Sequence, residues 1–169
     1  LLHREPDSRI LTIHRLVQRV LQDRMDVESQ RKWAERTVLA VSHAFPQLEF
    51  ATWPRCQRLI LQVQACVPLI EQWKVSFPEA AWLLHEAGSY LEERAQYREA
   101  EQLLQRATAL CEQVFGAEHP TTAASLNNLA NLYREQGKYE QVEPLSVRAL
   151  DIWVRVLGAK HPDLSLIHI

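Results

Sequence analysis

The chain has 169 residues, 47% of them hydrophobic, which suffices for one ordinary domain or a few small helical units with a buried core. Its net charge of −2 argues against a surface that neutralises nucleic-acid phosphates. Three cysteines without a C-x-x-C pair predict neither a disulfide framework nor a zinc site, so we expect a reducing, cytoplasmic location. The longest weakly polar run, residues 59–70, is too short to cross a membrane. With only four glycines, the composition favours helices.

The N-terminal segment predicts a β-hairpin followed by a helix. Residues 1–13 are two short apolar stretches joined by the turn-prone sequence “PDSR”, and “HRLVQRVLQDRM” at 14–25 follows as a helix. The stretch “LTIHRLVQRVL”, 11–21, resembles the end of the winged-helix unit of STAND-type ATPases, the class that includes NB-ARC proteins. In that class a histidine opens this helix and touches the phosphate end of bound ADP. The resemblance implies a nucleotide-sensing role for His14 in a parent protein; the alternative is an ordinary, partly buried histidine at a helix start.

Two more helices are expected before the middle of the chain. Asp26 is a candidate N-cap for an amphipathic helix over residues 27–44. “CQRLILQVQACVPLIEQW”, residues 56–73, predicts a second helix, in which Pro68 removes a hydrogen bond and clashes with the preceding turn, so we expect a kink or break there. A Ser-x-x-Glu capping box at residues 76–79 predicts the start of the next helix.

The second half of the chain repeats itself. “VFGAEHP” at 114–120 returns 42 residues later as “VLGAKHP” at 156–162, and the similarity extends back along both copies. In the second copy, apolar residues recur at i, i+3, i+4 and i+7, which predicts two amphipathic helices. Gly137 lies between the two helices of the second copy and can supply the left-handed residue that closes a helix. Each copy is therefore predicted to be a helix-turn-helix hairpin.

The repeated string itself is predicted to be the hinge between hairpins. Gly116 and Gly158 stand where a helix C-terminus favours a left-handed residue, and the prolines that end each string favour a new helix start. His119 and His161 are then interpreted as loop spacers or cap partners, not as ligands or bases. The five tryptophans of the chain are expected to be packing anchors.

The segment “LNNLANLYREQGKYEQVEPLSVRAL”, residues 126–150, resembles the tetratricopeptide repeat, in the 42-residue variety found in kinesin light chains and many bacterial signalling proteins. Small, aromatic and turn residues occupy the packing positions of that family: Ala130, Tyr133, Gly137, Tyr139 and Ala149. Val142 and Ser146 depart from the pattern and suggest looser packing. The resemblance implies an all-α fold, a tetratricopeptide-repeat α-solenoid of helical hairpins, preceded by the β-hairpin and helix of a winged-helix remnant.

The expected organisation follows from these segments. In chain order, we predict the end of a winged-helix unit over residues 1–24 and a helical spacer with a degenerate repeat over 25–78. Two tetratricopeptide repeats follow over 79–120 and 121–162, and a truncated tail over 163–169. This order resembles bacterial STAND proteins, which implies a protein-binding and coupling segment of a nucleotide-switched signalling ATPase. The alternative is a freestanding tetratricopeptide adaptor resembling kinesin light chain.

Catalytic chemistry is not indicated. The four glycines, at 88, 116, 137 and 158, allow no phosphate-binding loop, and no metal motif or nucleophile motif is present. We expect no enzymatic activity, metal or cofactor in this chain; ADP or ATP would belong to the parent protein. Turnover of ATP by the chain alone is the enzymatic alternative.

Binding residues are implied by the resemblance, because the first helix of each hairpin lines a concave groove in this family. The matching polar positions are Asn127, Asn131 and Arg134 in the second copy and His85, Ser89 and Glu92 in the first. Such side chains can pair with the backbone of an extended peptide. The alternative is that they are solvated residues beside a packed stripe. We expect a protein or peptide ligand in the groove, no nucleic acid and no membrane, with oligomerisation of the parent protein left open.

Overall fold

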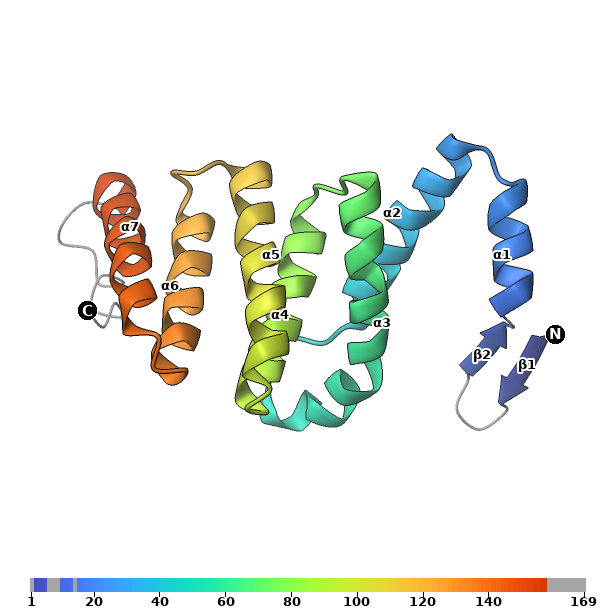
Figure 1. Cartoon of the computed structure of the whole chain (residues 1–169), viewed down its shortest axis with the longest axis horizontal. Coiled ribbons are helices and arrows are strands. Elements are labelled where there is room, and N and C mark those ends of the chain that lie inside the picture. The colour runs from blue at the N-terminus through green and yellow to red at the C-terminus, as the bar shows by residue number, and fades with distance from the viewer. Residues whose placement is uncertain (1, 6–9, 14, 158–169) are drawn as a thin grey trace.

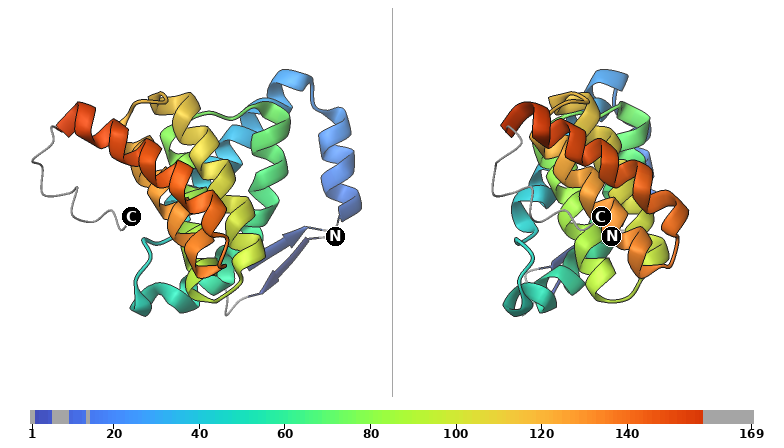
Figure 2. Two further views of the ribbon diagram at one scale, coloured as in Figure 1. Left: turned by 60° about the vertical axis from the view of Figure 1, so that its left-hand side comes forward. Right: turned by 90° about the vertical axis from the view of Figure 1, so that its left-hand side faces the viewer.

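The computed structural model describes residues 2–5, 10–13 and 15–157. Six helices, α2 to α7, follow one another along the longest axis of the molecule as a solenoid of helical hairpins (Figure 1). Seen with the C-terminal side in front, α7 lies ahead of the other helices (Figure 2). The predicted all-α solenoid is therefore confirmed. The elements are β1 Leu2–Glu5, β2 Ile10–Ile13, α1 Arg15–Arg24, α2 Val27–Ala44, the 3-10 turn η1 Phe50–Thr52, α3 Trp53–Trp73, α4 Pro78–Glu93, α5 Tyr97–Phe115, α6 Pro120–Glu135 and α7 Tyr139–Leu157.

The N-terminal elements lie at one end of the solenoid, beside α2 (Figure 1). Strands β1 and β2 pair antiparallel, with Leu2 opposite Ile13 and Glu5 opposite Ile10, and α1 follows as predicted. Two short strands and a helix do not define a winged-helix unit, so that assignment stays a prediction. His14 lies outside the described residues, and nothing in the structure tests its predicted role.

Helices α2 and α3 form a hairpin ahead of the two repeats. Asp26 caps α2 as predicted, since its Oδ1 accepts a hydrogen bond from the Ser29 backbone N–H at 2.8 Å. Helix α3 runs through Pro68 without interruption, so a break there is wrong, whereas a kink stays a prediction. The side chains of Pro68 and of Gln64, whose carbonyl loses its helical donor, are both exposed. Water can bond that carbonyl on the solvent side, which removes most of the penalty.

The two repeats begin alike, but not with the predicted capping box. Helix α4 starts at Pro78, and its N-cap is Phe77, which makes no side-chain cap bond, so the predicted box at 76–79 is wrong. Helix α6 starts at Pro120 with His119 as its N-cap. A proline at the first helical position has its φ preset for the helix and forces the residue before it into an extended conformation. Proline therefore sets both starts.

The turns inside the two hairpins share one geometry. Gly137 has a φ of 73°, and the Lys138 N–H donates to the Tyr133 carbonyl at 2.9 Å, which closes α6 as predicted. In the first hairpin Ala95 stands in the same place with a φ of 57°. There the Gln96 N–H donates to the Leu91 carbonyl at 2.8 Å. The first repeat thus makes the same turn without a glycine.

The two helices of the first hairpin pack closely at a glycine. A Cβ added to Gly88 of α4 would lie 2.7 Å from Leu104 Cγ of α5, so only glycine fits beside that leucine. At the equivalent positions 42 residues later stand Ala130 and Ser146, which are 1% and 3% exposed. Both positions are therefore buried in the second hairpin too, and the looser packing expected there stays a prediction.

Ion pairs connect successive hairpins. Arg106 Nε lies 2.6 Å from Glu71 Oε1, which joins α5 to α3, and Arg148 Nη1 lies 2.6 Å from Glu112 Oε1, which joins α7 to α5. The two arginines stand 42 residues apart, whereas their glutamate partners stand 41 apart, so the two links are similar without being strict repeats. Exposed pairs of this kind add little stability.

Candidate functional site

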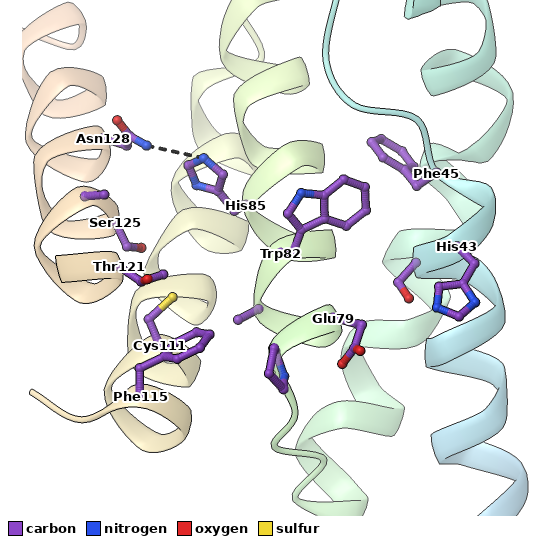
Figure 3. Close-up of a pocket in the computed structure, with 14 residues that line it drawn as sticks. His43, Phe45, Glu79, Trp82, His85, Cys111, Phe115, Thr121, Ser125 and Asn128 are labelled. Carbon is purple, nitrogen blue, oxygen red and sulfur yellow. Dashed lines mark hydrogen bonds between the residues drawn. The ribbon is translucent and has the colours of Figure 1, made fainter. Parts of the chain in front are cut away.

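A hollow lies between α4 and α6, with α2 and α5 at its sides. It encloses about 610 Å³. Figure 3 shows the Trp82 indole in its centre, with Phe45 from the end of α2 on one side and Phe115 of α5 below. Asn128 lies on the opposite, α6 side. We call this hollow the apolar pocket.

Trp82 is a large apolar side chain of this pocket that remains accessible to solvent. It is 37% exposed, whereas Phe45 is 3% exposed and forms part of the wall. Leu83 and Leu84 face the hairpin core with no exposed surface, which leaves the adjoining face of α4 for Trp82. The expectation that every tryptophan is a packing anchor is therefore wrong for Trp82, and also for Trp33, which is 54% exposed.

His85 and Asn128 meet across the pocket (Figure 3). The Asn128 Nδ2 atom lies 3.3 Å from His85 Nε2. Because an amide nitrogen only donates, the imidazole nitrogen accepts and carries no proton. Burial lowers the pKa of His85, which favours this neutral ring, while the Glu86 carboxylate acts in the opposite direction. Glu86 itself accepts a hydrogen bond from the Leu48 N–H at 2.7 Å, which ties the segment after Phe45 to α4.

A second hollow of about 450 Å³ lies further along α4 and α6. Three carboxylates gather in it, those of Glu92, Glu93 and Glu135, and Asn128 borders both hollows. Burial, followed by the charges of Glu135 and Glu93, raises the pKa of Glu92 to about 7. We call this hollow the acidic pocket, and we call the two pockets together the trench. Lining residues of the acidic pocket are Ser89, Glu92, Glu93, Tyr97, Asn128, Asn131 and Glu135.

Most of the predicted binding residues lie in the trench. His85 lines the apolar pocket, and Ser89, Glu92 and Asn131 line the acidic pocket. Arg134 lies beside it and donates a hydrogen bond to Asn131 Oδ1. Their role in binding stays a prediction.

Asn127 differs from the other predicted residues. It holds in α6 the position that His85 holds in α4, and it lines neither pocket. Its neighbour Asn128 takes the place opposite His85. Three pocket residues were not predicted from the sequence, Asn128, Trp82 and Glu135, although their helical spacing from predicted residues was a usable signal.

The repeated string is structural where it is described. His119 caps α6, since its Nδ1 accepts from the Thr121 N–H at 3.1 Å, and its ring stacks on Phe115 with centroids 5.1 Å apart. Gly116 has a φ of 100°, which favours glycine. The prediction of a cap partner is confirmed for His119. Gly158 and His161 lie outside the described residues.

Two absences among the described residues bear on function. They contain no group of three or more His, Cys, Asp or Glu side chains arranged to hold a metal ion. None of the described helices combines the length and the apolar character needed to cross a membrane.

The stacked helical hairpins form an α-solenoid of the tetratricopeptide type. Residues 79–146 match the family profile described as tetratricopeptide repeat. Among curated proteins, none matches the chain. The chain is similar to the solved structure of nearly identical tetratricopeptide-like repeats of a kinesin-light-chain candidate from Podosopora anserina. The sequence identity is 22% and the TM-score is 0.54, and the similarity covers 82% of this chain and 60% of that one.

BtubC (BKLC) from P. vanneervenii is a further structural neighbour. It has 16% identity and a TM-score of 0.51, over 85% of this chain and 63% of that one. The chain thus spans about three fifths of the length of these solved structures. At such identities the likeness shows the fold alone, which is that of kinesin-light-chain-like repeat solenoids.

Proposed function

We propose that the chain is a protein-interaction module that binds a peptide segment of a partner protein in the trench. The observation that carries this proposal is the apolar pocket, in which a part-exposed tryptophan stands beside polar side chains. Binding sites typically combine such an aromatic anchor with a few polar groups that fix orientation. Here His85 and Asn128 supply hydrogen-bonding groups next to Trp82 that can pair with a peptide backbone.

The test compares two tryptophans in the same chain. Random peptides displayed on phage are selected on the intact chain, and the recovered peptides are resynthesised with a fluorescent label. Affinities are then measured by fluorescence polarisation for the wild type, Trp82→Ala and Trp33→Ala. Trp33 is a matched control because it is exposed on α2 and lines neither pocket of the trench.

We expect Trp82→Ala to weaken binding at least tenfold, about 1.4 kcal/mol, and Trp33→Ala to leave it unchanged. Circular dichroism confirms that both variants stay folded. Failure to select any binding peptide, or equal losses for the two variants, would contradict the proposal. Asn127→Ala and Asn131→Ala then test the remaining polar positions separately. We expect a loss at Asn131, which lines the acidic pocket, and a smaller one at Asn127.

A finer proposal rests on the sequence resemblance. We propose that the solenoid is the ligand-binding and coupling part of a STAND-type signalling ATPase, in which His14 senses ADP. What supports it is the order of the segment “IHRLVQ”, a helical spacer and paired 42-residue repeats. The encoding DNA tests it: an upstream reading frame without a phosphate-binding loop contradicts the proposal. An upstream coiled coil or a start codon close to Leu1 would favour the adaptor resembling kinesin light chain.

We propose no catalysis for the chain by itself, and no cofactor. Nucleotide chemistry would then belong to a parent protein. Incubation of the purified chain with ATP and Mg²⁺ checks this point, with phosphate release as the readout. Release above the rate of a heat-denatured sample would contradict it.

A further inference from the structure

The two pockets of the trench adjoin each other at Asn128, which lines both. On α4, the residues Trp82, His85, Ser89 and Glu92 follow each other at helical spacing and therefore lie on one face. On α6, Asn128 borders both pockets. A ligand that occupies the apolar pocket can thus extend along α4 into the acidic pocket by passing over the His85–Asn128 pair, which lies where the two pockets meet.

The far end of the trench is negatively charged. Glu92 and Glu93 come from the end of α4, and Glu135 comes from the end of α6. Among the described residues that line this pocket, none is basic. Both burial and the two neighbouring carboxylates raise the pKa of Glu92, so each of these contributions disfavours its charged form. A cationic group placed between the three carboxylates would relieve their repulsion.

The helix geometry sets the distance between anchor and charge. Glu92 is ten residues after Trp82 and seven after His85 on the same helix. At a rise of about 1.5 Å per residue, these separations correspond to about 15 Å and 10 Å. An extended peptide advances about 3.3 Å per residue, so three to five peptide residues cover this distance.

We propose that the ligand is an extended basic peptide. Its aromatic or large aliphatic side chain fills the apolar pocket, and a lysine or arginine three to five residues away enters the acidic pocket. The inference rests on the proposed function, because it names the class of peptide that the same trench binds. The charge complementarity of the acidic pocket selects this occupant over an acidic peptide, whose carboxylates would be repelled there.

The experiment uses the peptides selected by phage display on the intact chain. We expect lysine or arginine to be enriched three to five residues from an aromatic or large aliphatic residue, on whichever side the peptide direction places it. For one selected peptide, the basic residue is replaced by serine and by glutamate. We expect the serine peptide to bind at least fivefold more weakly and the glutamate peptide more weakly still. Added salt should reduce these differences.

Variants of the chain assign the effect to the acidic pocket. Glu135→Gln combined with Glu92→Gln should bring the lysine and serine peptides to within twofold of each other. Glu143→Gln is the matched control, because this exposed glutamate of α7 lines neither pocket. In the wild type, the advantage of lysine should grow as the pH rises through about 7, where Glu92 loses its proton. The charged or titratable groups around Glu92 are Glu93, Tyr97, Glu135 and the neighbouring Arg134.

The outcomes separate this inference from the proposed function. Selected peptides that bind in the trench but carry no basic residue, or that bind equally after its replacement by glutamate, would overturn the inference and leave the proposed function standing. A double variant that keeps the full preference for lysine would also overturn it. If no peptide binds the chain, the proposed function fails and the inference fails with it.

Discussion

Ala95 offers a direct test of how the hairpin turn is held. It adopts a φ of 57° at the position that Gly137, with a φ of 73°, occupies in the next hairpin. A left-handed conformation costs an L-residue about 1–2 kcal/mol, because its Cβ crowds the following carbonyl oxygen. Glycine costs about 0.5–1 kcal/mol through the extra freedom of the unfolded chain. The difference predicts that Ala95→Gly stabilises the chain by about 0.5–1 kcal/mol.

The reciprocal variant is the control. Gly137→Ala should destabilise the chain by a similar amount, since the two turns have the same hydrogen bonds. Urea unfolding followed by circular dichroism measures both, with the whole curve fitted because repeat arrays can unfold in steps. In thermal unfolding, 1 kcal/mol corresponds to about 2–4 °C for a chain of this size. A destabilised Ala95→Gly, or a neutral Gly137→Ala, would refute the argument from φ.

Three further predictions concern stability. Gly88→Ala should destabilise the chain by about 1 kcal/mol, because the clash with Leu104 outweighs the gain in helix propensity; unchanged urea unfolding would contradict this. His119→Ala should destabilise the chain by about 1 kcal/mol because the helix cap is lost. His119→Asn should retain most of the stabilisation by the cap, and thermal unfolding measures both variants. Since the folded pKa of Glu92 is raised, its contribution to stability is lost as the pH rises from about 4.5 to 7. Glu92→Gln should therefore stabilise at pH 8 and not at pH 4, and a pH-independent effect would contradict the assignment.

The helices of the two repeats could be predicted because their signals are local. Prolines at 78 and 120 preset the first residue of α4 and α6, and tyrosines at 97 and 139 start α5 and α7 at the same interval of 42 residues. The closing turn was predicted at Gly137, where glycine is visible in the sequence. At the equivalent position of the first repeat the turn was not visible in the sequence, because there an alanine adopts the left-handed backbone conformation.

The wrong local predictions share a physical cause, which is a neighbouring feature that competes with the motif. The capping box at 76–79 predicts Ser76 as the N-cap, but Pro78 cannot follow a helical residue easily, so the N-cap moves by one position to Phe77. The break predicted at Pro68 assumes that the freed carbonyl has no partner. That assumption fails on a solvent-facing side of α3, and the sequence alone does not say which side of a lone apolar helix meets water.

The trench shows why a binding surface in a solenoid is harder to predict than its helices. Successive residues of a helix point about 100° apart, so Asn127 and Asn128 diverge although both belong to the polar side of α6. Which of them faces His85 depends on the rotation between two hairpins, and that rotation is set by the packing of α5 against α6. The apolar pocket depends on the rotation between hairpins even more, because the walls of the pocket come from α2, α4, α5 and α6. The pattern within one hairpin therefore predicts a polar stripe, whereas the site belongs to a pair of hairpins.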